Sequence, residues 1–197
     1  MSVSFLAIAA IVNTRGVIAS AGVGVAEKIC GFIMLIPSAF SQSLSAFVAQ
    51  NIGARKPDRA RKAMVYGMSA SFSIGVFIAY FAFFHGDILA KVFSNDGQVI
   101  LAAADYLRAY AVDVMMVAFL FCFLGYFNGC GNTKFVMVQG IIGAFGVRIP
   151  VSYFMSKIEG VSLFGIGLAT PASTIVQIIL CIVFLRYAIK KEKTLTS

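Results

Sequence analysis

The sequence predicts an all-α, polytopic membrane helix bundle of about six transmembrane helices. Hydrophobic residues make up 60% of the 197 residues, and charged residues make up 12%, compared with roughly 25% in soluble domains. Six apolar stretches fill most of the chain, and a helix needs roughly 20 residues to cross a bilayer. Little sequence remains for anything else, so we treat residues 1–197 as a single transmembrane domain.

The first two stretches are the least regular. The first, Val3 to about Ser20, has only a short apolar core, so we expect a truncated first helix. The second runs from about Gly22 to Gln50 and contains Pro37. Because proline lacks an amide donor, we expect a kink there.

The later stretches are bounded by turn residues. Asp105 and Arg108 mark the polar entry of the fourth and are neighbours at i,i+3. The glycine- and asparagine-rich residues 128–133 end it. In the fifth, Gly140, Gly143 and Gly146 lie on one face and predict close approach of another helix. The third to sixth stretches are expected at 63–84, up to about 127, at 135–155 and up to about 185.

The distribution of cations predicts an orientation, because short cytoplasmic loops collect Lys and Arg. One side of the predicted bundle holds a basic loop, Lys134 and the basic tail from Arg186 onward. Six crossings then place the loop at residues 51–62, the C-terminus and the N-terminus in the cytoplasm. The cations of the basic loop are Arg55, Lys56, Arg59, Arg61 and Lys62.

Several functional classes are not indicated. The net charge of +8 lies in short loops and not along a polar face, so we expect no nucleic-acid partner. The single His85 and the four cysteines lack metal-ligand spacing, so we expect no metal. No nucleotide-binding loop, zinc-protease or serine-hydrolase motif occurs in the sequence. We therefore expect no enzyme and no cofactor, with the lipid bilayer as the principal partner.

A specific resemblance begins at Pro37. The sequence from Pro37 to Lys62, PSAFSQSLSAFVAQNIGARKPDRARK, resembles the multidrug and toxic compound extrusion (MATE) transporters at the end of their eighth helix and the following loop. The segments VFSND, GYFNGCGNTK and VRIPVSY are similar to later landmarks of that family in the same order. The resemblance covers almost the whole chain and implies helices seven to twelve, the C-terminal half of a twelve-helix fold.

The resemblance also implies a function. MATE transporters export organic, often cationic, drugs and toxic compounds through a cavity between two lobes, driven by entry of protons or sodium. We therefore expect small organic substrates, a proton or sodium as coupling ion, and either a missing N-terminal lobe or self-association. Two alternatives stay open: a lipid-linked precursor flippase, which needs a more cationic cavity, and a non-transporting remnant that binds lipid or a partner.

Ionisable side chains within spans are the candidates for ion coupling, because a charge at the bilayer centre costs about 2.5–3.5 kcal/mol on insertion scales. Asp113 is the sharpest case, about a dozen residues into its span. Lipid disfavours its charged form, so it can take up a proton on one side and release it on the other. The competing hypothesis is a structural role, in which Asp113 pairs with a cation or caps a buried polar contact. Glu27, near the predicted outer boundary, is the second candidate.

Other polar residues are candidates for a substrate cavity. Arg148 could attract an anionic group, counter Asp113 or reach the interface by snorkelling. Amide side chains could line the cavity by donating and accepting hydrogen bonds, or could simply hold helices together in lipid. The amide candidates are Gln42, Asn128, Gln139 and Gln177.

Overall fold

The computed structural model describes residues 8–10, 12–13, 16–158 and 162–196. Helices form almost all of this part, and five stretches are long and apolar enough to cross a membrane. The all-helical membrane bundle is thus confirmed. The elements are α2 (Val17–Ile33), α3 (Leu35–Gly53), α4 (Pro57–Phe84), α5 (Gly86–Lys91), α6 (Gly97–Gly129), α7 (Thr133–Ile141), the π-helix η1 (Ile142–Arg148), α8 (Ile149–Lys157), α9 (Leu163–Gly167) and α10 (Ala169–Thr196).

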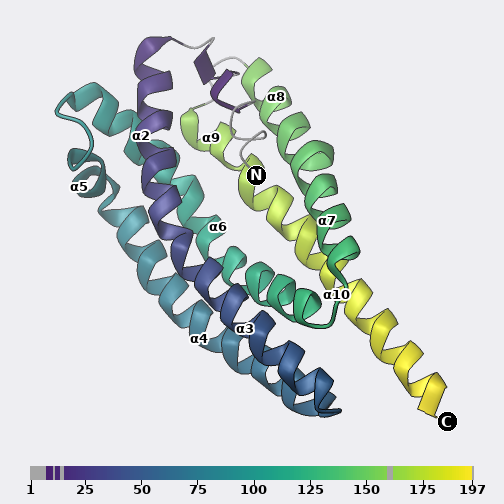
Figure 1. Ribbon diagram of the computed structural model, residues 1–197. Helices are drawn as coiled ribbons and strands as arrows, with labels where there is room; N and C mark the ends of the chain where they lie inside the picture. The colour runs from purple at the N-terminus through teal and green to yellow at the C-terminus, as the bar shows by residue number, and fades with distance from the viewer. Residues whose placement is uncertain (1–7, 11, 14–15, 159–161, 197) are drawn as a thin grey trace.

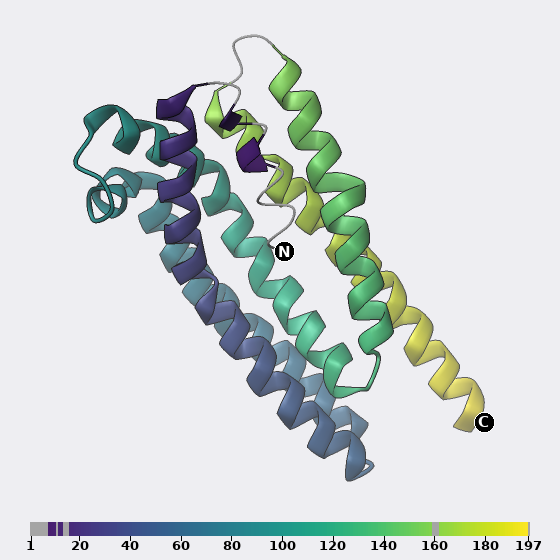
Figure 2. The same cartoon turned by 45° about the horizontal axis from the view of Figure 1, so that its top comes forward.

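The helix α6 lies at the centre of the bundle. It packs against α2, α3 and α4 on one side and against α7, α9 and α10 on the other, as both views show (Figures 1 and 2). It is also the most buried of the five candidate spans. Tyr106, Leu107, Tyr110 and Phe127 are among its fully enclosed side chains. Polar side chains in the middle of α6 are therefore buried inside the lobe.

The predicted boundaries need two corrections. Of the first predicted stretch, Val3 to about Ser20, residues 3–7, 11 and 14–15 lie outside the described residues. The next helix already begins at Val17, after Gly16 with φ 109°. The predicted basic loop is also shorter than expected, because α4 begins at Pro57 and includes Arg59, Arg61 and Lys62 in its first turns. Pro57 fits there, since the first turn of a helix needs no donor from it.

In two of the membrane-spanning stretches a proline follows the end of a helix by four residues. Pro37 cannot donate to the carbonyl of Ile33, and α2 ends at Ile33. Pro171 cannot donate to Gly167, and α9 ends at Gly167. In each path one residue separates the two helices, so the chain bends and continues. The kink predicted at Pro37 thus appears as a break four residues earlier.

Two helices end in the same type of cap at the same end of the bundle. After α3, Arg55 adopts φ 56° and the Lys56 amide donates to Asn51 O at 2.8 Å. After α6, Gly131 adopts φ 79° and the Asn132 amide donates to Phe127 O at 2.8 Å. Both are Schellman caps, which satisfy carbonyls that a helix leaves open. Figure 1 shows both turns at the end of the bundle toward which the C-terminal part of α10 extends.

A close helix approach that was not predicted involves two glycines of α6. A methyl group added at Gly125 would collide with the backbone of Ser41, and one added at Gly129 would collide with Ser45 and Val48. These two glycines form a G-x-x-x-G pair that brings α6 against α3. Of the predicted set, Gly143 alone meets another helix, while space is open at Gly140. Among the described residues, the predicted approach is therefore found at Gly143 and not at Gly140 or Gly146.

We expect Gly125→Ala to destabilise the protein by about 1–3 kcal/mol, because the added methyl forces α3 and α6 apart. Gly140→Ala is the matched control and should be neutral or stabilising by up to about 1 kcal/mol, because alanine is the better helix former. Unfolding in a mixed-detergent titration measures both changes. Equal midpoints for the two variants would show that the α3–α6 approach is not tight.

Candidate functional site

The centre of the site is Asp113, in the middle of α6. Its side chain is fully buried, and Oδ1 accepts a hydrogen bond from the Thr174 hydroxyl of α10 at 2.6 Å. The second oxygen, Oδ2, is enclosed and has no hydrogen-bond partner among the described residues. A buried polar atom without a partner needs an explanation, such as an ion, a water or a proton. One oxygen of Asp113 is therefore held by a hydrogen bond, and the other is available to bind an ion, a water or a proton.

The Thr174 hydroxyl suits both charge states of this carboxyl. Thr174 Oγ1 also lies 3.2 Å from Thr170 O, one turn earlier on α10. When Asp113 is ionised, the hydroxyl donates to the carboxylate. When Asp113 is protonated, the carboxyl can donate to Thr174 Oγ1, and the hydroxyl then turns to Thr170 O, because a hydroxyl both donates and accepts. Uptake of a proton would not disrupt this contact.

Arg148, at the end of η1, is the cation of the site. It is 4% exposed, and its charge interacts electrostatically with Asp113, Tyr106 and Tyr110. Neighbouring residues on α10 fix its helix: Ser173 Oγ donates to Gly143 O at 2.7 Å, and the Gln177 side chain packs on Gly143. Ser173 and Thr174 thus tie η1 and α6 to the same turn of α10.

Further buried polar groups surround the pair. The hydroxyls of Tyr106, Tyr110 and Thr170 are enclosed, and none has a hydrogen bond of good geometry within the described part of the chain. Cys30 of α2 interacts with Asp113 and also with half-buried Glu27. Glu27 lies one turn before Cys30 on α2, with one carboxylate oxygen enclosed.

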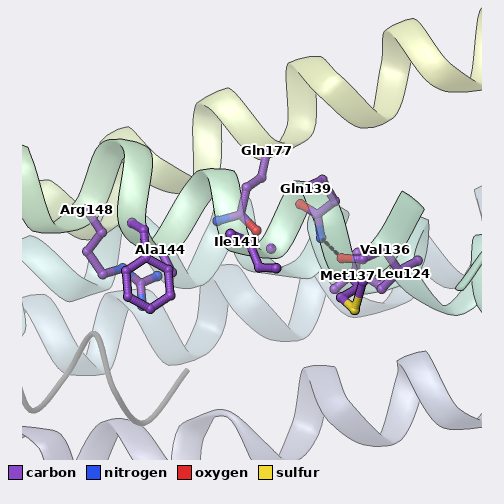
Figure 3. Close-up of a pocket in the computed structure, with 10 residues that line it drawn as sticks. Leu124, Val136, Met137, Gln139, Ile141, Ala144, Arg148 and Gln177 are labelled. Carbon is purple, nitrogen blue, oxygen red and sulfur yellow. Dashed lines mark hydrogen bonds between the residues drawn. The ribbon is translucent and has the colours of Figure 1, made fainter. Parts of the chain in front are cut away.

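A cavity of about 340 Å³ lies between α6, α7, η1 and α10 (Figure 3). Gln139 projects from α7 and Gln177 from α10. In Figure 3, Gln177 lies between Gln139 and Arg148. Gln139 Nε2 donates to Val136 O at 3.1 Å, which leaves its buried Oε1 without a partner in the described residues. The rest of the lining is apolar: Leu124, Val136, Met137, Gly140, Ile141, Ala144 and Phe145.

The structure separates the predicted site residues into two groups. Asp113 and Arg148 are buried, Glu27 is half-buried on α2 one turn from buried Cys30, and Gln139 and Gln177 share the cavity with Arg148. Gln42 is exposed on α3, and Asn128 is exposed in the last turn of α6, so neither lines this cavity. The basic loop residues lie at the turn between α3 and α4 and in the first turns of α4, and none of them lines this cavity.

Sequence reasoning missed the residues that hold Asp113 and Arg148 in place. Thr174, Ser173 and Thr170 looked like ordinary small polar residues within an apolar stretch. The one feature of the sequence that could have indicated them is their position around Pro171. A proline leaves backbone carbonyls of a helix without a donor, and nearby hydroxyls can donate to such carbonyls. Asp105 also has an unforeseen role, since its Oδ2 accepts a hydrogen bond from the Phe164 amide at 3.1 Å and so caps α9.

A family model described as MatE matches residues 1–154. The chain belongs to the MatE family. It is 21% identical over 193 residues to the "Probable multidrug resistance protein YoeA" of Bacillus subtilis, covering 98% of this chain and 42% of that protein. It is 24% identical over 163 residues to the "FAD transporter" of Shewanella oneidensis, covering 83% of this chain and 36% of that protein.

Solved structures agree on the fold. An inward-facing multidrug resistance MATE transporter of the MOP superfamily superposes with a TM-score of 0.86 at 22% identity, over 94% of this chain and 42% of that chain. A MOP superfamily transporter of Pyrococcus furiosus, whose binding pocket is described as having reversed polarity, gives 0.84 at 22% identity over 93% and 40%. This MatE chain thus spans about two fifths of the length of these four relatives and is a multi-pass membrane protein.

We expect Thr174→Val to lower the free energy of unfolding by about 1.5–3 kcal/mol, because it removes the hydrogen bond to a buried carboxyl. Thr174→Ser keeps the hydroxyl and should recover most of that loss. Ser69→Ala is the surface control, since Ser69 Oγ donates only to Val65 O on an exposed face. Detergent unfolding measures the three variants. A valine variant as stable as wild type would exclude a structural role for the Asp113–Thr174 contact.

Proposed function

We propose that this chain is one lobe of a cation-coupled exporter of organic compounds, with Asp113 as the group that binds the coupling ion. The observation that carries the proposal is the fully buried carboxyl with one fixed and one unpartnered oxygen. An ionisable group within a membrane span is a functional candidate by default, because its burial is costly. The Thr174 contact supports reversible loading, since it accommodates a protonated as well as an ionised carboxyl.

The cavity supports the export of small organic compounds. Its apolar wall suits the body of an amphipathic molecule, while Gln139 and Gln177 offer hydrogen bonds. The relatives named as multidrug resistance proteins favour such substrates, and the one named as an FAD transporter widens the range to anions. Because the relatives are more than twice as long, we propose that a second lobe, or a second copy of this chain, completes the transport path.

The flippase alternative is less well supported by the cavity. A lipid-linked precursor carries phosphates, which several cations would be needed to bind. Of the ten described residues that line the cavity, Arg148 is the one with a charge. A single cation that also interacts with Asp113 is a weak phosphate site, so we favour export of less highly charged compounds.

We also propose that the basic end of the bundle faces the cytoplasm. The turns at residues 54–56 and 130–132 and the C-terminal part of α10 share that end in Figure 1. With the first turns of α4 and with Lys134, this end holds ten of the 16 Lys and Arg residues, whereas at the opposite end Lys91 is paired with Asp87 on the surface. The excess of cations favours the cytoplasm.

Export should depend on titration at Asp113. In the transporter that contains this chain, Asp113→Asn keeps the size and hydrogen bonding of the side chain but removes its charge. Ion-driven efflux per folded molecule should then fall at least about tenfold, while substrate binding persists. Vesicle efflux across pH and sodium series measures this. Asp96→Asn, at the exposed start of α6, should keep the wild-type profile, and an unchanged profile for Asp113→Asn would refute the assignment.

Labelling of single cysteines tests the orientation. In a chain with the partly exposed Cys130 replaced by Ser, Lys56→Cys should resist an impermeant reagent added outside intact cells, and Asn95→Cys should react. Both positions are exposed, so access depends on the side of the membrane alone. Permeabilised cells provide the control, in which both must react. The opposite pattern in intact cells would reverse the proposed topology.

A further inference from the structure

The two glutamines of the cavity are held in one orientation by the groups beside them. Gln139 Nε2 donates to Val136 O at 3.1 Å, and because a carbonyl only accepts, the nitrogen of this amide must face it. Gln177 Nε2 donates to Ser173 Oγ at 3.1 Å. The single hydroxyl proton of Ser173 is donated to Gly143 O at 2.7 Å, so Ser173 can only accept from the amide. Neither amide can turn round without losing its hydrogen bond.

This orientation leaves both side-chain oxygens as acceptors without a donor. Gln139 is 2% exposed, and its Oε1 is enclosed with no hydrogen-bond partner among the described residues. Gln177 is 5% exposed, and its hydrogen bond within the described part of the chain is made by the nitrogen. Figure 3 shows the two oxygens on the sides of the amides that face each other. A buried acceptor without a donor is costly, so this pair needs a partner.

The partner that fits such a pair is an uncharged group with N–H bonds. The apolar residues of the wall, such as Leu124, Met137 and Ile141, suit a hydrocarbon or aromatic body. The two amides carry no formal charge, so they replace little of the hydration that an ammonium ion loses in an apolar cavity. A carboxamide or an aromatic amine loses far less hydration and still donates to both oxygens.

We propose that the cavity between α6, α7, η1 and α10 selects uncharged organic compounds with an N–H donor, which binds between Oε1 of Gln139 and Oε1 of Gln177. This rests on the proposed function and names the substrate class of the same cavity. The selection is made by hydrogen bonds and not by positive charge. Asp113 does not line this cavity, so the coupling ion and the donor group bind to different atoms.

The glycine at position 143 allows Gln177 to occupy its place. A methyl group added at Gly143 would collide with Cγ, Cδ and Nε2 of Gln177. Gly143→Ala should therefore displace the amide without removing it from the chain. Gly146→Ala is the matched control on the same π-helix, because a methyl group there meets only the Ile142 side chain, at 3.8 Å.

The test measures binding to the full transporter in detergent, without an ion gradient. The probes are 2-naphthamide and methyl 2-naphthyl ketone, two uncharged aromatic molecules of the same shape that differ by an NH₂ group in place of a methyl group. Equilibrium dialysis gives the dissociation constant of each probe, and the ratio of the two constants reports recognition of the N–H group. Both probes enter detergent equally in wild type and variants, so comparison of the ratios removes this contribution.

Wild type should bind the amide at least about tenfold more tightly than the ketone, because the ketone leaves both acceptors unpaired. Gln139→Leu and Gln177→Leu should each reduce this preference to about twofold or less. Gly143→Ala should reduce it as well. Gly146→Ala, and Gln42→Leu on the exposed face of α3, should keep the wild-type ratio. A naphthylmethyl trimethylammonium ion, which has a charge but no N–H bond, should bind no more tightly than the ketone.

Equal affinity of wild type for the amide and the ketone would overturn the inference. So would a preference that survives in both leucine variants, or tighter binding of the trimethylammonium probe than of the amide. Because wild type alone can give the first and third of these results, a variant that fails to fold does not decide the outcome. Cation-driven efflux without a preference for the amide would refute the donor site alone, whereas selective binding of the amide without any cation-driven efflux would refute the proposed function.

Discussion

Burial of Asp113 is the constraint on which the arrangement of this lobe depends. A carboxyl in lipid must be protonated, paired or hydrogen-bonded, because the unpartnered charged form is costly there. Thr174 on α10 meets this requirement at Oδ1, while Oδ2 has no hydrogen-bond partner among the described residues. Together with the contact of Ser173 to Gly143 O, this hydrogen bond ties α10 to both α6 and η1.

Hydrogen bonding in lipid accounts for the bends in the other helices. No water is available to satisfy a freed backbone group, so a proline must be placed where the chain can adjust. Pro37 and Pro171 each lie four residues after a helix end, and the next amide continues the ladder: Ser38 donates to Met34 O at 3.1 Å and Ala172 to Leu168 O at 3.2 Å. The bend at Pro171 brings Thr170, Ser173 and Thr174 to face α6 and η1.

Much of this fold could be predicted from the sequence because its signals are local. Apolar length indicates the spans, Pro37 indicates a break, and the glycine at 131 indicates the end of α6. The packing could not be predicted in the same way. Gly125 and Gly140 look alike in the sequence, and only the position of Ser41 on another helix distinguishes them. The Asp113–Thr174 contact joins residues 61 positions apart, which no local pattern reports.

One turn of α10 holds both the buried carboxyl and the wall of the cavity. Thr174 donates to Asp113 Oδ1, and its neighbour Ser173 donates to the Gly143 carbonyl of η1 and accepts from Gln177, which lines the cavity. In lipid no water is available to replace a hydrogen bond that is lost in this turn. A movement of Thr174 would therefore disturb the Ser173 and Gln177 contacts beside it, whereas Oδ2 of Asp113 can gain or lose a partner while the Thr174 hydrogen bond stays in place.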